Sequence, residues 1–187
     1  VKNISSIYGK YLSNTLIAKP TGWRNGNFSG VLNEVGSHVI DLIQYILRED
    51  EFNVNYVKKE SVISDVDDII EARLKSKNNK VVNFYFNWVK KDVRKPLFEI
   101  EIKMKNGEKY SIDQQQINQY NFDGDLTNKI SVTDIAETVP FYLRGIDFTK
   151  QMQDLLQDCN QLSSLKEGLA VNNLMNKIIK HENNSRG

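Results

Sequence analysis

The sequence predicts an α+β fold in which an open, mostly antiparallel sheet carries helices on one face. The middle of the chain alternates apolar and polar residues over 80–90 and 97–105, as half-buried strands do. Asn106-Gly107, directly after the second segment, is a strong signal for a hairpin turn. Residues 32–47 instead repeat their apolar side chains with the period of an α-helix. A sheet with one apolar face, covered by amphipathic helices, gives the α+β arrangement.

The strands of the expected sheet are rich in β-branched and aromatic residues and are separated by turn formers. They are expected at 4–17, 53–64, 69–76, 80–90 and 97–105, with a return strand that holds Tyr110 and Ile112. A loop is expected at 19–27, a turn at 77–79, and a polar irregular loop over 114–132.

Three helices are expected, each with an apolar stripe for the core. The central helix, 32–47, would bury Val35, Val39, Leu42, Ile43 and Ile46. A second helix would bury Phe148, Met152, Leu155, Leu156 and Cys159. The last begins at Ser164, which forms a capping box with Glu167, and would bury Ala170, Val171, Leu174 and Ile178.

The composition excludes several classes of protein. The 187 residues suit one domain, and a net charge of +1 gives no electrostatic basis for binding nucleic acid or an anionic membrane. No apolar run approaches the length needed to span a bilayer. A single cysteine, Cys159, excludes an internal disulfide and favours a cytoplasmic location. Because the chain starts at Val1 without an initiator Met, we expect it to be one domain of a longer protein.

One line of the central helix carries side chains suited to proton transfer. Glu34, His38, Asp41 and Tyr45 are spaced so that they follow one side of the helix, opposite the apolar stripe. A histidine can accept or donate a proton near neutral pH, and a carboxylate one turn away can hold its tautomer. Two alternatives stay open: His38 packs or caps with Glu34 merely exposed, or Glu34, His38 and Asp41 ligate a metal.

The loop before this helix holds a second set of candidate residues. Trp23 and Arg24 lie among glycine and asparagine residues, where the guanidinium could bind a polar ligand and the indole could stack on it. The alternative is a loop anchored by a buried tryptophan. Gly22, Gly26 and Gly30 lack the spacing and the strand–turn–helix setting of a phosphate-binding loop, so no dinucleotide site is expected in this chain.

The helix motif resembles the signature of the Gfo/Idh/MocA oxidoreductases, which include glucose–fructose oxidoreductase and inositol dehydrogenase. Residues 34–41 match the pattern Asp or Glu, then x-Gly-x-His-x-x-Asp. The Trp23-Arg24 loop, Phe141-Tyr142, Phe148 and residues 163–171 are also similar to the family. The resemblance covers the whole chain but only the second domain of the family's two. It implies the glyceraldehyde-3-phosphate-dehydrogenase-like C-terminal fold.

The resemblance also implies a function. His38 would be the acid/base acting on a hydroxyl or carbonyl of a sugar or polyol, and Glu34 would stand near the substrate hydroxyls. Trp23, Arg24 and Asp41 would help to shape the substrate site. NAD or NADP would be bound mainly by an N-terminal Rossmann domain that this chain lacks, so residues 1–187 alone would be inactive. The open sheet face would form a homo-oligomer interface.

Two other functions fit the same residues. The chain could be a non-catalytic sugar-binding or dimerisation module of the same fold, which the presence of a cofactor domain before Val1 would decide. A metal-dependent lyase or isomerase on Glu34, His38 and Asp41 is the third, which a metal analysis would decide.

Overall fold

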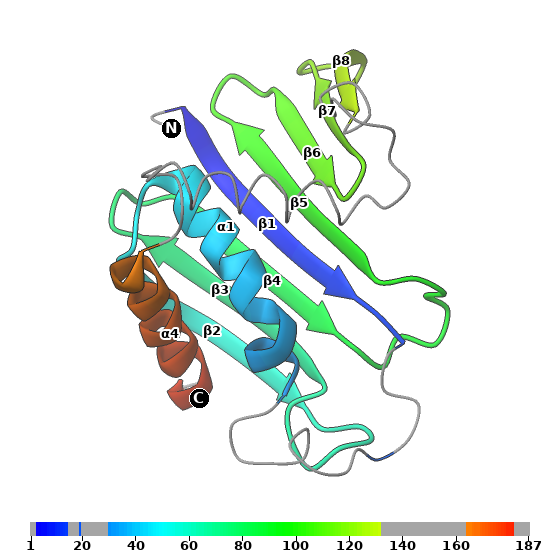
Figure 1. Ribbon diagram of the computed structural model, residues 1–187. Coiled ribbons are helices and arrows are strands. Elements are labelled where there is room, and N and C mark those ends of the chain that lie inside the picture. Colours follow the sequence, from blue (N-terminus) through cyan, green and yellow to red (C-terminus); the bar gives the residue numbers. More distant parts are fainter. Residues whose placement is uncertain (1–2, 15–18, 20–29, 132–163, 182–187) are drawn as a thin grey trace, which may run out of the picture.

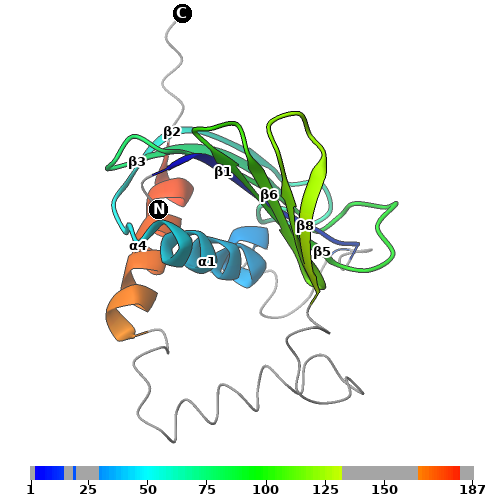
Figure 2. The same cartoon turned by 90° about the horizontal axis from the view of Figure 1, so that it is seen from above.

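The computed structural model describes residues 3–14, 19, 30–131 and 164–181, and all statements below concern these residues. They form one eight-stranded sheet with helices on one face only (Figures 1 and 2). The strands are β1 (Ile4–Leu12), β2 (Phe52–Glu60), β3 (Ile69–Ser76), β4 (Val81–Asn87), β5 (Leu97–Met104), β6 (Lys109–Asp113), β7 (Gln116–Tyr120) and β8 (Leu126–Ser131). Their order in the sheet is β2-β3-β4-β1-β5-β6-β7-β8.

The first strand lies in the middle of this sheet. It runs parallel to β4 and antiparallel to β5, and the other neighbouring strands are antiparallel. The predicted α+β class and the mostly antiparallel open sheet are therefore confirmed. So is the hairpin at Asn106-Gly107, where Gly107 takes a φ of +89° that a side chain would disfavour.

The alternation predicted for 80–90 places the core on the helix side of the sheet. Val82, Phe84, Phe86 and Trp88 are all buried, and the rings of Phe84 and Phe86 stack with centroids 5.4 Å apart. Across β1, Gly9 lies opposite Phe84 and Ile100. The helix above packs directly on this position, because Gly9 has no side chain.

Replacing Gly9 by alanine is expected to lower the free energy of unfolding by about 2 kcal/mol, the usual scale of overpacking. The new Cβ would lie 2.6 Å from Val39 Cγ1 and 2.9 Å from Ile43 Cδ1, so the helix must shift. Gly168→Ala is the matched control: nothing lies within 4 Å of its Cβ, and an exposed helix position gains about 0.5–1 kcal/mol from alanine. Chemical denaturation of both variants measures the difference. Equal stability of the two would contradict the close approach.

The helices on the sheet are η2 (Leu32–Gly36), a single π-helical turn, α1 (Ser37–Leu47) and α4 (Leu165–Lys180). The predicted capping box is confirmed, since Ser164 Oγ accepts from the N–H of Glu167 and the Glu167 carboxylate accepts from the N–H of Ser164. α4 buries Val171, Leu174, Met175 and Ile178, while Ala170 is only partly buried.

The core-facing stripe of the central helix was partly wrong. Val39 and Ile43 are buried as predicted, but Val35, Leu42 and Ile46 are only partly buried. Ile40 and Leu47 take the remaining buried positions. The buried side of α1 is therefore rotated from the predicted stripe towards Ile40 and Leu47.

Other predicted bounds also needed correction. Residues 114–132 are not an irregular loop, because 116–120 and 126–131 form β7 and β8 at the sheet edge. The first strand ends at Leu12 rather than at 17. The helix predicted around Phe148–Cys159 lies outside the described residues. Among the residues that are described, no helix is long and apolar enough to cross a membrane.

Candidate functional site

The π-helical turn η2 begins the element that carries the candidate acid/base residues. Gly30 starts it with a φ of +119°, and the N–H of Val31 donates to the carbonyl of Asp67 at 2.9 Å. The turn closes where the N–H of Ser37 donates to the carbonyl of Leu32, five residues earlier. Single π-helical turns of this kind are rare and often lie at functional sites.

Gly36 allows this wide turn to pack on the sheet. A Cβ at Gly36 would lie 2.8 Å from Leu32 Cδ1 and 3.0 Å from Phe86 Cε2, closer than side chains tolerate. The glycine therefore sets how closely the start of α1 approaches β4. Glu34 lies inside the turn and His38 follows directly after it, so both depend on this contact for their position.

The predicted line on the central helix is on the side away from the core. His38 and Tyr45 are exposed, and Glu34 and Asp41 are partly buried. Asp41 lines a cavity on the α4 side of α1, whose described lining residues do not include Glu34 or His38. Trp23 and Arg24 lie in 20–29, outside the described residues, so the structure does not test their predicted role.

The metal alternative is not supported in the described part of the chain. There, no three histidine, cysteine, aspartate or glutamate side chains gather in a way that could hold a metal ion. Glu34, His38 and Asp41 follow one helix without converging on a common point of ligation.

A buried carboxylate, which the sequence analysis missed, holds the loop beneath η2. Asp68 is fully buried and accepts hydrogen bonds from the N–H groups of Val62, Ile63 and Ser64 at 2.6–3.0 Å. The Ser64 hydroxyl and the Trp88 indole N–H also donate to it, each at 2.6 Å. Burial alone would raise the pKa of Asp68, but these donors outweigh burial and hold the pKa below its ordinary value.

This carboxylate supports the start of the candidate site through the backbone. The neighbouring carbonyl, that of Asp67, is the acceptor for the N–H of Val31 at the start of the helical segment. Asp68 thus fixes the loop on which η2 rests. The only signal in the sequence was two adjacent aspartates immediately before an apolar strand.

A second buried charge anchors the other end of α1. The carboxylate of Glu49 pairs with the ammonium of Lys80, and the two side chains are 8% and 9% exposed. Burial would raise the pKa of Glu49, but hydrogen bonds from Lys80, Ser76 and Asn78 lower it to about 2. The pair fastens the end of the helix to the turn between β3 and β4.

This pair predicts a pH dependence of stability. The pKa of Glu49 is about 2 in the folded chain and 4.5 in a free side chain, so its contribution is complete above pH 4.5 and is lost as the pH falls towards 2. Glu49→Gln is expected to lower the free energy of unfolding at neutral pH by about 3 kcal/mol, because it leaves Lys80 buried without its partner.

Urea denaturation at a series of pH values measures this effect. The matched control is Glu51→Gln, since Glu51 forms an exposed pair with Lys77, each side chain being 66% exposed. The control should change stability by less than about 0.5 kcal/mol. If Glu49→Gln loses stability at low pH as the wild type does, Glu49 is not the source of this pH dependence.

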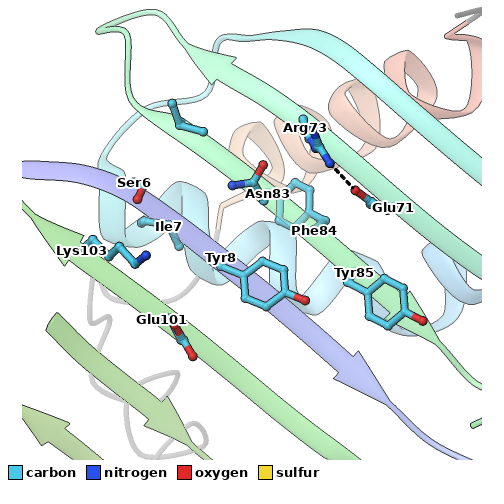
Figure 3. Close-up of a pocket in the computed structure, with 11 residues that line it drawn as sticks. Ser6, Ile7, Tyr8, Glu71, Arg73, Asn83, Phe84, Tyr85, Glu101 and Lys103 are labelled. Atoms are coloured by element: carbon cyan, nitrogen blue, oxygen red, sulfur yellow. Dashed lines mark hydrogen bonds and ion pairs between the residues drawn. The ribbon is translucent and has the colours of Figure 1, made fainter. Parts of the chain in front are cut away.

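The open face of the sheet forms a broad, shallow cavity of about 810 Å³ (Figure 3). Tyr8 and Tyr85 lie across its middle from neighbouring strands, and Glu71 pairs with Arg73 at 2.9 Å. Lys103 and Glu101 come from β5 on the other side of β1. Burial first, and then Tyr85 and nearby carboxylates, raise the pKa of Tyr8. The face is polar, of mixed charge, and carries partly buried aromatic rings.

Comparison with known proteins identifies the fold. No protein-family model and no curated protein matches the sequence. Among solved structures, the chain shares the fold of the C-terminal α+β domain of Gfo/Idh/MocA-type oxidoreductases, which confirms the fold that the helix motif implied.

Three of these structures illustrate the likeness. They are an oxidoreductase domain protein from Kribbella flavida (TM-score 0.77, 18% identity, 96% of this chain and 56% of that one), levoglucosan dehydrogenase in complex with NADH and levoglucosan (0.77, 16%, 96% and 56%), and UDP-N-acetylglucosamine 3-dehydrogenase from Acidithiobacillus ferrooxidans (0.66, 13%, 94% and 52%). The chain thus spans about half the length of the structures it matches. At these identities the likeness establishes the fold.

Proposed function

We propose that the chain is the substrate-binding and subunit-association domain of an NAD(P)-dependent oxidoreductase that acts on a sugar, a polyol or a derivative. The observation that carries the proposal is the side of η2 and α1 that presents Glu34 and His38 away from the sheet. The fold supports it, because structures with this fold include a dehydrogenase in complex with NADH and levoglucosan. The remaining half of such a protein would be a separate dinucleotide-binding domain.

The described residues do not themselves suit a dinucleotide. Their one parallel strand pair is β1 with β4, and Gly30 at the start of η2 is not followed by the glycine spacing that binds a pyrophosphate. The proposal therefore assigns the cofactor to the companion domain. A nicotinamide cofactor bound there supplies the acceptor or donor of the hydride.

In this proposal the chain's own residues bind the substrate and move the proton. In the direction of oxidation, His38 accepts the proton of the substrate hydroxyl as its carbon gives up a hydride; in the reverse direction, His38 returns the proton to the carbonyl oxygen. Glu34 accepts hydrogen bonds from neighbouring hydroxyls and orients the ring. Asp41 would orient the helix and its neighbours, and Trp23 and Arg24 would help to shape the pocket.

The test is a hydride-transfer assay on the proposed two-domain protein. With a panel of sugars and polyols and either cofactor, we expect reduction of the nicotinamide, measured by its absorbance. Residues 1–187 alone should give no turnover. Failure of every sugar and polyol with both cofactors would reject the proposal and favour a non-catalytic module of the same fold.

We also propose that the chain self-associates through the open sheet face around Tyr8. Tyr8→Glu is expected to weaken self-association by about 100-fold or more, because it places a carboxylate near Glu101 in a surface that would lose its water. Tyr45→Glu, on the exposed side of α1, is the control and should associate normally. Sedimentation equilibrium measures both. A wild-type chain that stays monomeric at high concentration would refute the interface.

A further inference from the structure

A smaller cavity lies between the second half of α1 and the first turn of α4. Its volume is about 330 Å³, large enough for a monosaccharide. Asp41, Gln44 and Tyr45 line it from α1, and Lys166 and Glu167 line it from α4. It is distinct from the open sheet face, which lies on the other side of the sheet.

Gln44 is the residue that makes this cavity unusual. Gln44 lines the cavity beside α4, and the residue is only 8% exposed, next to the buried Ile43 of the core. Nevertheless, its Nε2 amide has no hydrogen-bond acceptor in the described part of the chain. Buried amides normally have acceptors because an unmet donor is costly. A ligand that supplies an acceptor would relieve this cost.

The charges of the lining disfavour an anion as that ligand. Glu49 is neutralised by Lys80, which leaves Asp41, Asp50 and Glu167 against Arg48 and Lys166. The start of α4 offers no open anion site, because the capping box already places the Glu167 carboxylate there. A cation fits poorly as well, since the orphaned group of Gln44 is a donor.

The same lining suits a molecule whose groups both donate and accept. Gln44 needs an acceptor, whereas Asp41 and Asp50 need donors, and hydroxyl groups provide both. Tyr45 adds an aromatic wall, and the guanidinium of Arg48 lies 4.2 Å from its ring centroid.

We infer that this cavity is a binding subsite for a neutral polyhydroxylated small molecule, a sugar or a polyol. The subsite is separate from the acid/base residues His38 and Glu34. The inference does not depend on catalysis, and its test measures binding to residues 1–187 without any cofactor.

The experiment is a titration of the ¹⁵N-labelled chain with myo-inositol and, separately, with glucose, observed by NMR. The side-chain NH₂ signal of Gln44, identified by its loss in Gln44→Leu, is expected to shift and to saturate, together with the ring signals of Tyr45. Gln44→Leu should weaken binding by about fivefold or more, as the loss of one hydrogen bond predicts. Gln114→Leu, the same change in an exposed turn, should bind like wild type.

The other outcomes overturn the inference. If neither polyol shifts the Gln44 signal, the amide donates its hydrogen bond to water and not to a polyol. If only calcium or sodium chloride moves it, the cavity is a cation site. If Gln44→Leu binds as tightly as wild type, the polyol lies elsewhere. The two tests can give different answers. The chain can bind a polyol at Gln44 although the oxidoreductase assay shows no turnover, and it can show turnover without such binding, so this inference and the proposed function can fail separately.

Discussion

Replacing His38 by alanine is expected to lower kcat by about 10²-fold or more in the protein that contains both this chain and its proposed cofactor domain, the usual loss when a general acid/base is removed. His38 is exposed on α1, so the change should not disturb the core. Steady-state kcat and KM with the best sugar or polyol substrate measure it.

The sequence offers a matched control, because its other histidine is His181 at the end of α4. His181→Ala should leave kcat unchanged. Circular dichroism and thermal unfolding of His38→Ala should match wild type. Wild-type turnover in a folded His38→Ala protein would remove His38 from the mechanism, whatever the reaction is.

Replacing Asp68 by alanine is expected to lower the free energy of unfolding by about 4 kcal/mol or more, the scale at which a buried hydrogen-bond network fails. The substitution removes the acceptor of the buried Trp88 indole N–H, of the buried Ser64 N–H and of the partly buried N–H groups of Val62 and Ile63, and a buried donor without an acceptor carries a desolvation cost. Urea denaturation followed by tryptophan fluorescence measures the change.

Asp123→Ala is the control for this prediction, because Asp123 is exposed in the turn between β7 and β8. It should stay within about 0.5 kcal/mol of wild type. A loss below about 1 kcal/mol in Asp68→Ala would mean that water replaces the carboxylate, and that the loop under η2 is held by other contacts.

The sheet was predictable wherever one of its faces is apolar. Val82, Phe84 and Phe86 alternate with polar residues because one side of β4 meets the helices and the other does not. β7 and β8 were missed because they lie beyond the helices, at the edge, with polar side chains on most positions. The turn between them does carry a hairpin signal, Asp123-Gly124, whose glycine has a φ of +92°.

The candidate site was predictable in composition but not in geometry. The spacing from Glu34 to His38 predicted a shared side of the helix, on which His38 is exposed and Glu34 is partly buried. The π-helical turn could not be read from that spacing, and its close packing at Gly36 against Phe86 joins residues that are distant in the sequence. The Asp68 network, likewise, depends on Trp88, which lies 20 residues away in the sequence, directly after β4.

The central place of β1 has a consequence for how the chain folds. Ile7 lies opposite Val82 on one side and Ile102 on the other, so the strand that comes first in this sheet pairs only with strands that come much later in the sequence. Such distant pairings slow folding, because a long loop must close, at a cost in chain entropy, before the strands can form their stabilising contacts. During synthesis, β1 cannot form both of its strand pairs until β5 has left the ribosome. Any fragment that ends before Met104 leaves the middle of the sheet without one of its two neighbours.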